Sequence, residues 1–340
     1  MHSHGWRRAT AVSKSSSSRE AENGRQRPTA TRVSPGKFLG SLGLDLPRLE
    51  PGKPGDPGLF GLDSMIWAVG RERILLAGGA AALLLQVAHP LVAAGVAAHS
   101  DFLADPFRRL QVTLDTTLRI TFGDREQAMA AAEAVRRVHV RVRGRLLQPV
   151  GRFDSGTPYD ASDPNLALWV HASLLATSLQ VYGRFVRRLS LADRERYYQE
   201  AKPFARLFGV GDDVLPPDYR AFRVYLARMV EGPDLAVGGD ARLLAAQILA
   251  PPVPLAARPA LPPLRAVTAW LLPARLRGEF GLSWGRGERA LVAGLGWPTR
   301  LAVQTLPGRL RYWPHHGIAR VRLPKNGNEQ GRSSVFHKAF

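Results

Sequence analysis

The 340-residue sequence contains no cysteine. This absence excludes disulfides, thiolate metal ligands, iron–sulfur clusters and a cysteine nucleophile. The sequence also lacks a phosphate-binding loop, a dinucleotide-binding fingerprint, a G-x-S-x-G turn and an H-E-x-x-H zinc motif. Any metal centre must therefore use nitrogen and oxygen donors. The missing motifs also give no support for a common hydrolase or a nucleotide-binding protein.

Strand patterns are almost absent, and so are the regular strand–helix alternations of parallel α/β folds. With 45 % hydrophobic residues, the chain can bury a large core. We therefore predict one large all-α domain over residues 56–320. The most apolar stretch, residues 74–88, is only fifteen residues long and contains Gln86 and two glycines, so it indicates a central buried helix and no transmembrane segment.

Acidic residues are few, and the formal net charge is +19. Residues 1–55 carry ten Lys or Arg against four Asp or Glu and include a serine run, which predicts a disordered basic extension. Residues 321–340 are expected to form a flexible tail. The remaining arginines are dispersed and no recognition motif accompanies them, so we expect no specific nucleic-acid partner. No secretory signal pattern is found, and a cytoplasmic location is expected.

Local signals set the expected ends of several helices. Asp105-Pro106 starts one helix, and Asp124 with Gln127 forms a capping box for the next, which Gly144 would end. Ser190 with Asp193 caps another helix. The remaining expected helices are residues 65–69, 74–88, 91–98, 165–185, 191–208, 217–230, 240–249, 266–272 and 289–295.

Residues 105–144 carry the polar groups of greatest interest. Arg109 and Thr113 lie one turn apart on the first helix of this stretch, and His139 lies on the apolar stripe of the second. A neutral imidazole on such a stripe is either a metal ligand or a hydrogen-bonded packing residue. His89, His99 and His171 have the same two interpretations, and the residues alone leave both open.

The order of several short blocks resembles the rubber oxygenase (latex-clearing protein) and mycophenolic-acid-pathway oxygenase catalytic-domain family. The likeness runs over residues 56–315. Its blocks are DPGLFG at 56–61, LLLQVAHP at 83–90, GVAAHSDF at 95–102, Arg109-Leu110 with Thr113, FGD at 122–124, Val138-His139, LWVHA at 168–172, RYYQE at 196–200 and LLPARLR at 271–277.

The resemblance implies a buried pocket that holds one haem b, and an oxygenase that uses dioxygen on a small apolar substrate such as an isoprenoid or another alkene. Carried over residue by residue, it makes His139 the iron ligand. Arg136, one turn earlier, and His171 become further cofactor-binding residues. Arg109 and Thr113 become the catalytic pair on the opposite side of the haem, where they stabilise negative charge on oxygen.

Two positions differ from the latex-clearing branch. Val112 stands where that branch has a lysine, and residues 91–98 contain no glutamate to serve as its proposed base. We therefore expect a substrate other than polyisoprene. A non-catalytic haem- or lipid-binding helical protein is the alternative, and a membrane or nucleic-acid binder driven by the basic N-terminus is a third possibility.

Overall fold

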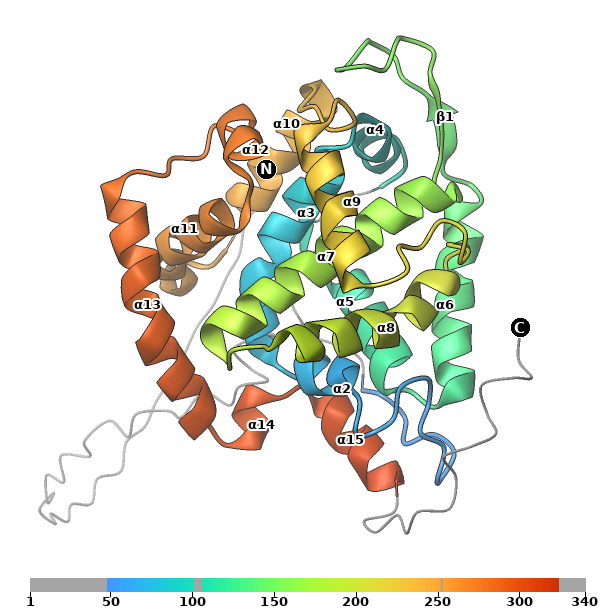
Figure 1. Ribbon diagram of the computed structural model, residues 1–340, viewed down its shortest axis with the longest axis vertical. Helices are drawn as coiled ribbons and strands as arrows, with labels where there is room; N and C mark the ends of the chain where they lie inside the picture. Colours follow the sequence, from blue (N-terminus) through green and yellow to red (C-terminus); the bar gives the residue numbers. More distant parts are fainter. Residues whose placement is uncertain (1–47, 101–105, 252, 324–340) are drawn as a thin grey trace, which may run out of the picture. The chain divides into compact units, whose positions relative to one another are not determined.

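Helices make up almost all regular structure in this computed structural model, as the sequence predicts. The structure describes residues 48–100, 106–251 and 253–323, which belong to one compact unit. The longer helices, shown in Figure 1, are α3 (Gly79–Val87), α4 (Pro90–His99), α5 (Pro106–Phe122), α6 (Arg125–His139), α7 (Pro164–Phe185), α8 (Leu191–Arg206), α9 (Tyr219–Glu231), α10 (Gly239–Leu249), α11 (Leu261–Leu271), α13 (Arg286–Thr305) and α15 (Pro314–Arg322). The shorter ones are α2 (Met65–Gly70), α12 (Ala274–Glu279), α14 (Gly308–Arg311) and the 3₁₀ helices η1 (Arg73–Gly78) and η3 (Leu255–Ala260).

Helix α7 is buried on two sides and joins two hydrophobic clusters. Trp169 and Phe185 pack with α3, α10 and α11, whereas Leu175 and Tyr182 pack with α2 and α8. The Trp169 indole N–H donates to the Leu85 carbonyl at 2.9 Å, which fixes α7 against α3. The predicted helix over residues 165–185 is therefore confirmed.

The apolar stretch at residues 74–88 forms two elements, where the sequence predicts one. Residues up to Gly78 form the 3₁₀ helix η1, and the buried α-helix α3 begins at Gly79. Gly78 lies so close to α7 that a Cβ atom there would come within 2.9 Å of Val181 Cγ2. Among the described residues no single helix is long and apolar enough to cross a membrane; η1–α3 and α4 meet that description only as a pair, bent by 105°.

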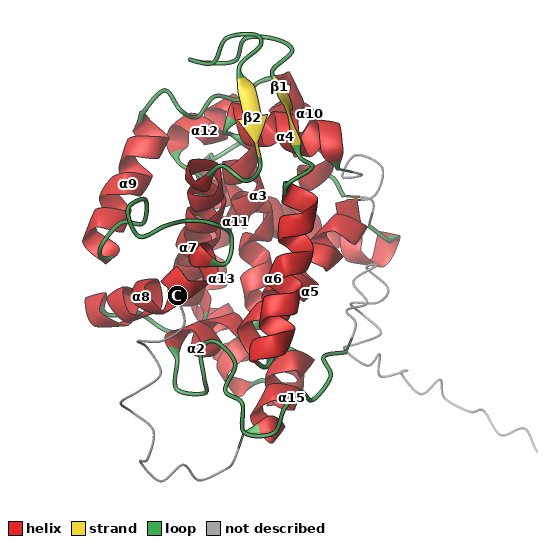
Figure 2. Cartoon of the chain, turned by 90° about the vertical axis from the view of Figure 1, so that its right-hand side faces the viewer, coloured by secondary structure: helices red, strands yellow, loops and turns green. Residues whose placement is uncertain are grey.

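A sharp turn at Gly123-Asp124 joins α5 and α6, which pack along each other (Figure 2). The predicted capping box is confirmed: the Asp124 carboxylate accepts from the Gln127 backbone N–H at 2.8 Å, and the Gln127 side chain accepts from the Asp124 N–H. Asp124 also accepts from the Lys53 N–H at 2.7 Å. The predicted cap at Asp105 lies outside the described residues.

Gly144 does not end a helix, which corrects the prediction from the sequence. Helix α6 ends at His139, and Gly144 lies in strand β1 (Arg143–Arg145), opposite Tyr159 of the antiparallel strand β2 (Pro158–Asp160). A Cβ atom at Gly144 would come within 2.4 Å of the Tyr159 hydroxyl. Glycine is needed here because an aromatic ring crosses the strand, and this contact is invisible in the local sequence.

Order extends beyond both expected boundaries of the domain. Leu49 is buried, although residues 48–55 fall within the predicted disordered extension. At the other end, Arg322 and Leu323 are buried and α15 packs on α5. Arg322 donates to the carbonyl oxygens of Asp56 and Phe122 at 2.8 and 3.1 Å, so the two ends of the described chain meet beside the α5–α6 turn.

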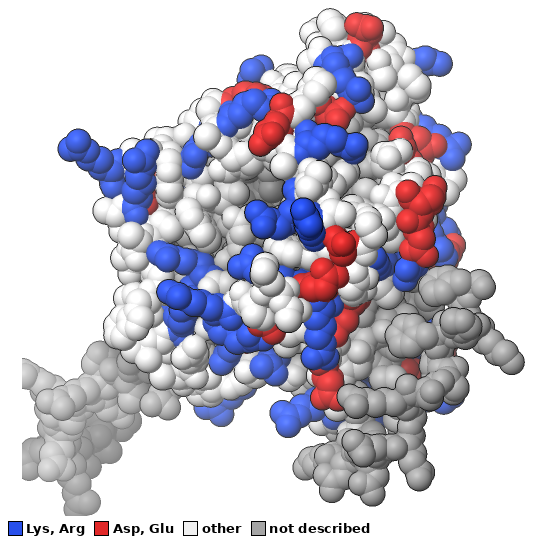
Figure 3. All heavy atoms as spheres, viewed as in Figure 1, with Lys and Arg blue, Asp and Glu red and all other residues white. Residues whose placement is uncertain are grey.

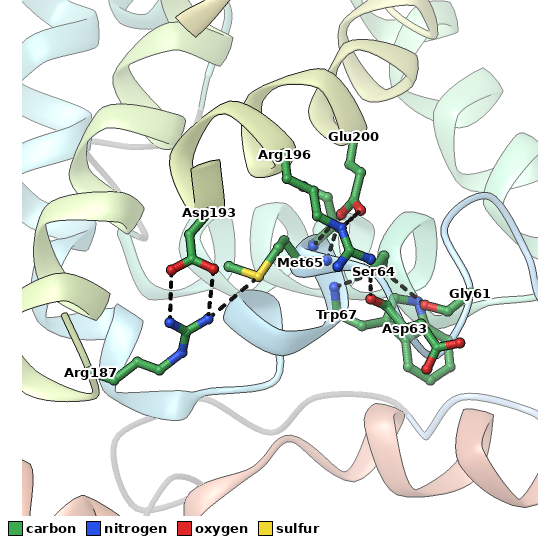
Figure 4. Close-up of polar contacts among 10 residues, drawn as sticks. Gly61, Asp63, Ser64, Met65, Trp67, Arg187, Asp193, Arg196 and Glu200 are labelled. Atoms are coloured by element: carbon green, nitrogen blue, oxygen red, sulfur yellow. Dashed lines mark hydrogen bonds and ion pairs between the residues drawn. The ribbon is translucent and has the colours of Figure 1, made fainter. Parts of the chain in front are cut away.

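Helix α8 holds the start of α2 through side chains of the RYYQE block (Figure 4). The Glu200 carboxylate accepts from the backbone N–H groups of Met65 and Ile66, and Arg196 donates to both Glu200 and the Asp63 carbonyl. A carboxylate at a helix N-terminus satisfies otherwise unpaired N–H groups and interacts favourably with the helix dipole. This block is therefore structural.

We expect Asp124→Ala to lower the free energy of unfolding by about 1–2 kcal/mol, because it removes an N-cap and leaves the Lys53 N–H without its acceptor. Asp124→Asn retains a capping oxygen and should cost less. Chemical denaturation measures both values. Asp213→Ala, a change at an exposed loop aspartate, is the matched control; an equal loss in the control and in Asp124→Ala would contradict this assignment.

Candidate functional site

The α5–α6 hairpin places the predicted site residues at one end of the two helices. Arg109 and Thr113 belong to the first half of α5, and Arg136 and His139 belong to the last turn of α6. Because the turn at Gly123-Asp124 reverses the chain, the start of α5 lies level with the end of α6 (Figure 2). The backbone therefore brings these four positions to the same end of the hairpin.

A row of four rings connects His139 with His171. The His139 ring lies 6.2 Å from that of Phe208, Phe208 lies 5.5 Å from Phe204, and Phe204 stacks on His171 at 5.6 Å between ring centroids. The rings come from α6, the end of α8 and the segment that follows it, and α7. The structure thus brings the two predicted cofactor-binding histidines to opposite ends of one aromatic row.

His171 is a buried, neutral imidazole. Burial lowers its pKa to about 4, because a charged ring loses its hydration in this apolar setting. A neutral imidazole with an available lone pair has the chemistry of an iron ligand or of a hydrogen-bonding neighbour to one.

The other predicted residues are placed as follows. Thr113 is exposed, and its backbone carbonyl accepts from the Thr117 hydroxyl at 2.8 Å. Arg109 lies in α5, and its side chain is outside the described part of the structure. Arg136 is exposed and forms an ion pair with Glu133, with Nε 3.0 Å from Oε2. The described polar partner of Arg136 is therefore Glu133.

Apolar side chains are exposed at the same end of the hairpin. Val112 on α5 and Val138 on α6 are each 56 % exposed, and Val140, just after α6, is 54 % exposed. Large apolar groups that remain in solvent beside a candidate site are typical of a ligand-binding surface. This end of the hairpin therefore combines imidazole chemistry with apolar surface.

No cluster of three or more His, Asp or Glu with metal-binding geometry occurs within residues 48–100, 106–251 and 253–323. A multi-ligand zinc or dinuclear site is thus not found there, whereas a haem iron needs only one or two protein ligands. His99 is occupied structurally, since its Nε2 lies 3.1 Å from the Arg143 carbonyl and 3.3 Å from the Tyr159 hydroxyl. His89 is buried against Phe153, with no hydrogen-bond partner for Nδ1 in the described chain.

Two adjoining surface pockets of about 250 and 360 Å³ lie elsewhere, on the far part of α7. They share Leu179, Gln180 and Arg194, and neither is lined by His139 or His171. These two pockets are therefore separate from the candidate histidine site, which consists of the end of the α5–α6 hairpin and the row of four rings.

Comparison with known families decides the class of protein. The family model described as "ER-bound oxygenase mpaB/B'/Rubber oxygenase, catalytic domain" matches residues 66–301. The chain belongs to this family. The match includes the α5–α6 hairpin, the ring row and the RYYQE block, so the resemblance inferred from the residues is confirmed.

Two curated mycobacterial proteins are similar to this oxygenase-family chain. An uncharacterized protein of Mycobacterium bovis and one of Mycobacterium tuberculosis are each 28 % identical over 235 residues, covering 68 % of this chain and 89 % of theirs. No solved structure matches the chain. The family assignment thus supports an oxygenase catalytic domain in general, and these relatives identify no substrate.

Several blocks that characterise this oxygenase-family chain build the hairpin turn. Gly58 of the DPGLFG block has φ +71° and lies so close to Gly123 that a Cβ atom would overlap the Gly123 carbonyl oxygen. The Asp56 carboxylate accepts from the N–H groups of Gly58 and Arg125 at 2.8 and 3.2 Å. The DPGLFG and FGD blocks therefore meet in space and orient α6, which carries His139.

Sequence reasoning missed His315 and His316, which lie in α15 and are buried. His315 Nε2 lies 3.7 Å from an Asp115 carboxylate oxygen, and neither ring nitrogen has a hydrogen-bond partner within the described chain. His316 packs edge-on against Trp67 and Phe122. Pro314, which stands at the first position of α15, was the available signal for this helix.

We expect stability to fall as pH decreases from about 6.5 to about 4. Burial lowers the pKa of His89 and of His316 to about 4, whereas both titrate near 6.5 in the unfolded chain. In this window the unfolded state binds more protons, so ∂ΔG/∂pH for unfolding is positive. His316→Phe retains the aromatic packing and should reduce this slope, as measured by denaturation at several pH values.

The matched control is Leu147→Ser, which replaces a non-titrating side chain that is 91 % exposed and should leave the slope unchanged. If His316→Phe and wild type have the same pH dependence of unfolding free energy, buried His316 does not contribute in this way.

Proposed function

We propose that this oxygenase-family protein is a haem b-dependent enzyme that uses dioxygen to oxidise a small apolar substrate with an alkene or isoprenoid chain. The family match supports the oxygenase class. The observation that carries the proposal is the row of rings that links His139 to the neutral, buried His171 beside an exposed apolar end of the α5–α6 hairpin.

The described residues fit a haem in donor type and surroundings. The chain has no cysteine, so a thiolate ligand to haem iron is excluded and an imidazole is the proposed ligand. Burial lowers the pKa of His171 to about 4, which keeps that ring neutral at pH 7. Phe204 and Phe208 offer ring faces for porphyrin packing, and Val112 and Val138 offer apolar contacts. Bound haem would supply dioxygen activation.

The chain's own residues would take three roles. His139 would hold the iron, with His171 as a second imidazole that orients or packs against the cofactor. Arg136 lies one turn from His139 on an exposed helix end, and exchanging its Glu133 partner for a haem propionate would preserve a charge-assisted hydrogen bond. Arg109 and Thr113 would donate hydrogen bonds to the reacting oxygen, where negative charge develops.

Val112 directs the proposal towards substrates other than polyisoprene. An exposed valine next to Thr113 cannot donate a proton or a hydrogen bond, as a lysine could, and it adds apolar contact area. Cleavage of a carbon–carbon double bond and of the O–O bond, with one atom of the same dioxygen bonded to each carbon, yields two carbonyl groups and needs no external reductant. The predicted products are therefore paired aldehydes or ketones.

Haem binding tests the ligand assignment directly. Purified protein with added haemin is expected to show a Soret band, and His139→Ala should lose or strongly shift it because the iron ligand is gone. His171→Ala should alter the band less. His99→Ala, at an exposed histidine, is the matched control and should resemble wild type.

Absence of a Soret band from wild type would overturn the haem proposal. An unchanged band from His139→Ala would overturn the choice of ligand while leaving haem binding intact.

Turnover separates an oxygenase from a binding protein. With haem-loaded protein and a panel of terpenoids, we expect dioxygen consumption coupled to carbonyl products. Arg109→Ala should lower the rate roughly a hundredfold and Thr113→Val by a smaller factor, since each removes a donor to developing negative charge. Thr116→Val on the same helix is the matched control.

Haem binding without dioxygen consumption would instead favour the alternative, a non-catalytic haem- or lipid-binding protein. Val112 is the residue that points towards it, because the latex-clearing branch has a lysine there.

A further inference from the structure

Helix α13 presents an apolar face to solvent. Its inward residues, Val292, Gly296 and Val303, are buried. The outward residues recur every three or four positions, as one helical face requires, and most of them are apolar: Ala290, Leu291, Ala293, Gly294, Trp297, Pro298, Leu301 and Ala302, with Gln304 and Thr305 in the last turn. Between Arg289 and Arg309 the one charged residue is Arg300, which points inward and donates to the Gly183 and Arg184 carbonyls at 2.8 and 2.9 Å.

The exposure of this face is large. Trp297 is 72 % exposed, Leu301 is 47 % exposed and Leu291 is 37 % exposed, and Leu306 just after the helix is 41 % exposed. The solvent side of a surface helix normally carries charged and polar groups. Helix α13 is buried on one side and mainly apolar on the other, so its exposed side is a candidate interaction surface.

Arginines stand at both ends of the face. Arg286 and Arg289 are exposed in the first turn of α13, and Arg309 is exposed in α14 just beyond it. The described chain gives none of their guanidinium groups a carboxylate partner. The nearby acid, Glu288, is occupied by the Ser283 hydroxyl and the Gly285 N–H. The left margin of Figure 3, over α13, is largely white below Lys or Arg side chains.

We propose that α13 docks the protein on an anionic membrane surface. Trp297, Leu291 and Leu301 enter the headgroup region, and the flanking arginines bind lipid phosphates. Tryptophan prefers this interface because it has a large apolar ring and one polar N–H. The helix lies in the plane of the interface, and no single described helix is long and apolar enough to span a membrane.

The charge of the chain favours an anionic membrane over a second copy of the chain or its own terminal segments as the partner of α13. A second copy of the chain carries +19, as this one does, and would bring further arginines to the arginines at the ends of the face. Residues 1–47 and 324–340 are also net basic and offer no complementary charge. An anionic lipid surface supplies both the apolar layer and the negative charge. This inference stands independently of the proposed oxygenase activity.

Vesicle flotation of the full chain, without haem, tests the proposal. Wild type should float with phosphatidylcholine vesicles that contain phosphatidylglycerol, and less with phosphatidylcholine alone. The double variant Trp297→Ser/Leu301→Ser should partition about tenfold less, because it removes the largest inserted apolar groups. The control Leu147→Ser/Val224→Ser removes side chains that are 91 % and 65 % exposed elsewhere and should float like wild type.

Salt separates α13 from the basic N-terminus. Binding through charge alone falls as salt screens it, whereas the part supplied by α13 should persist in high salt and be lost in the double variant. Circular dichroism melting checks that both double variants remain folded. Flotation of the Trp297 double variant like wild type, failure of wild type to float, or a dimer that dissociates on the same substitution would each overturn the proposal.

Discussion

The hydrogen bonds of one carboxylate organise the part of the chain that carries the candidate site. Asp124 caps α6, accepts from the Lys53 N–H and lies at the turn that sends α6 back along α5. Arg322 of α15 donates to the Phe122 carbonyl on the other side of the same turn. Because this turn sets how α5 and α6 pair, it also places the start of α5, with Arg109 and Thr113, beside the end of α6, with His139.

Helices whose ends are set by neighbouring residues are predictable from sequence. The capping boxes at Asp124 and Ser190 depend on side chains three positions away, and both are confirmed. Features that depend on contacts between residues far apart in the sequence were not predicted correctly. The local sequence at Gly144 predicts the end of a helix. The structure instead requires glycine there because the Tyr159 ring occupies the space that a Cβ atom would take.

The candidate site divides in the same way. Sequence pattern and family resemblance selected His139 and His171, which the structure connects through Phe204 and Phe208. Neither phenylalanine was predicted, because each matters only through the packing of α8 beside α6 and α7. The helix expected at residues 289–295 is longer at both ends: α13 runs from Arg286 to Thr305, contains Pro298, and buries Val292 and Val303.

A crystal structure of the haem-loaded protein would test the proposed haem site. We propose that His139 lies on one side of the bound haem and that Arg109 and Thr113 lie on the other. We therefore expect a bond from iron to a His139 ring nitrogen, with Arg109 and Thr113 across the porphyrin plane from that bond. Iron bound to a different residue, or Arg109 and Thr113 on the same side as His139, would contradict it.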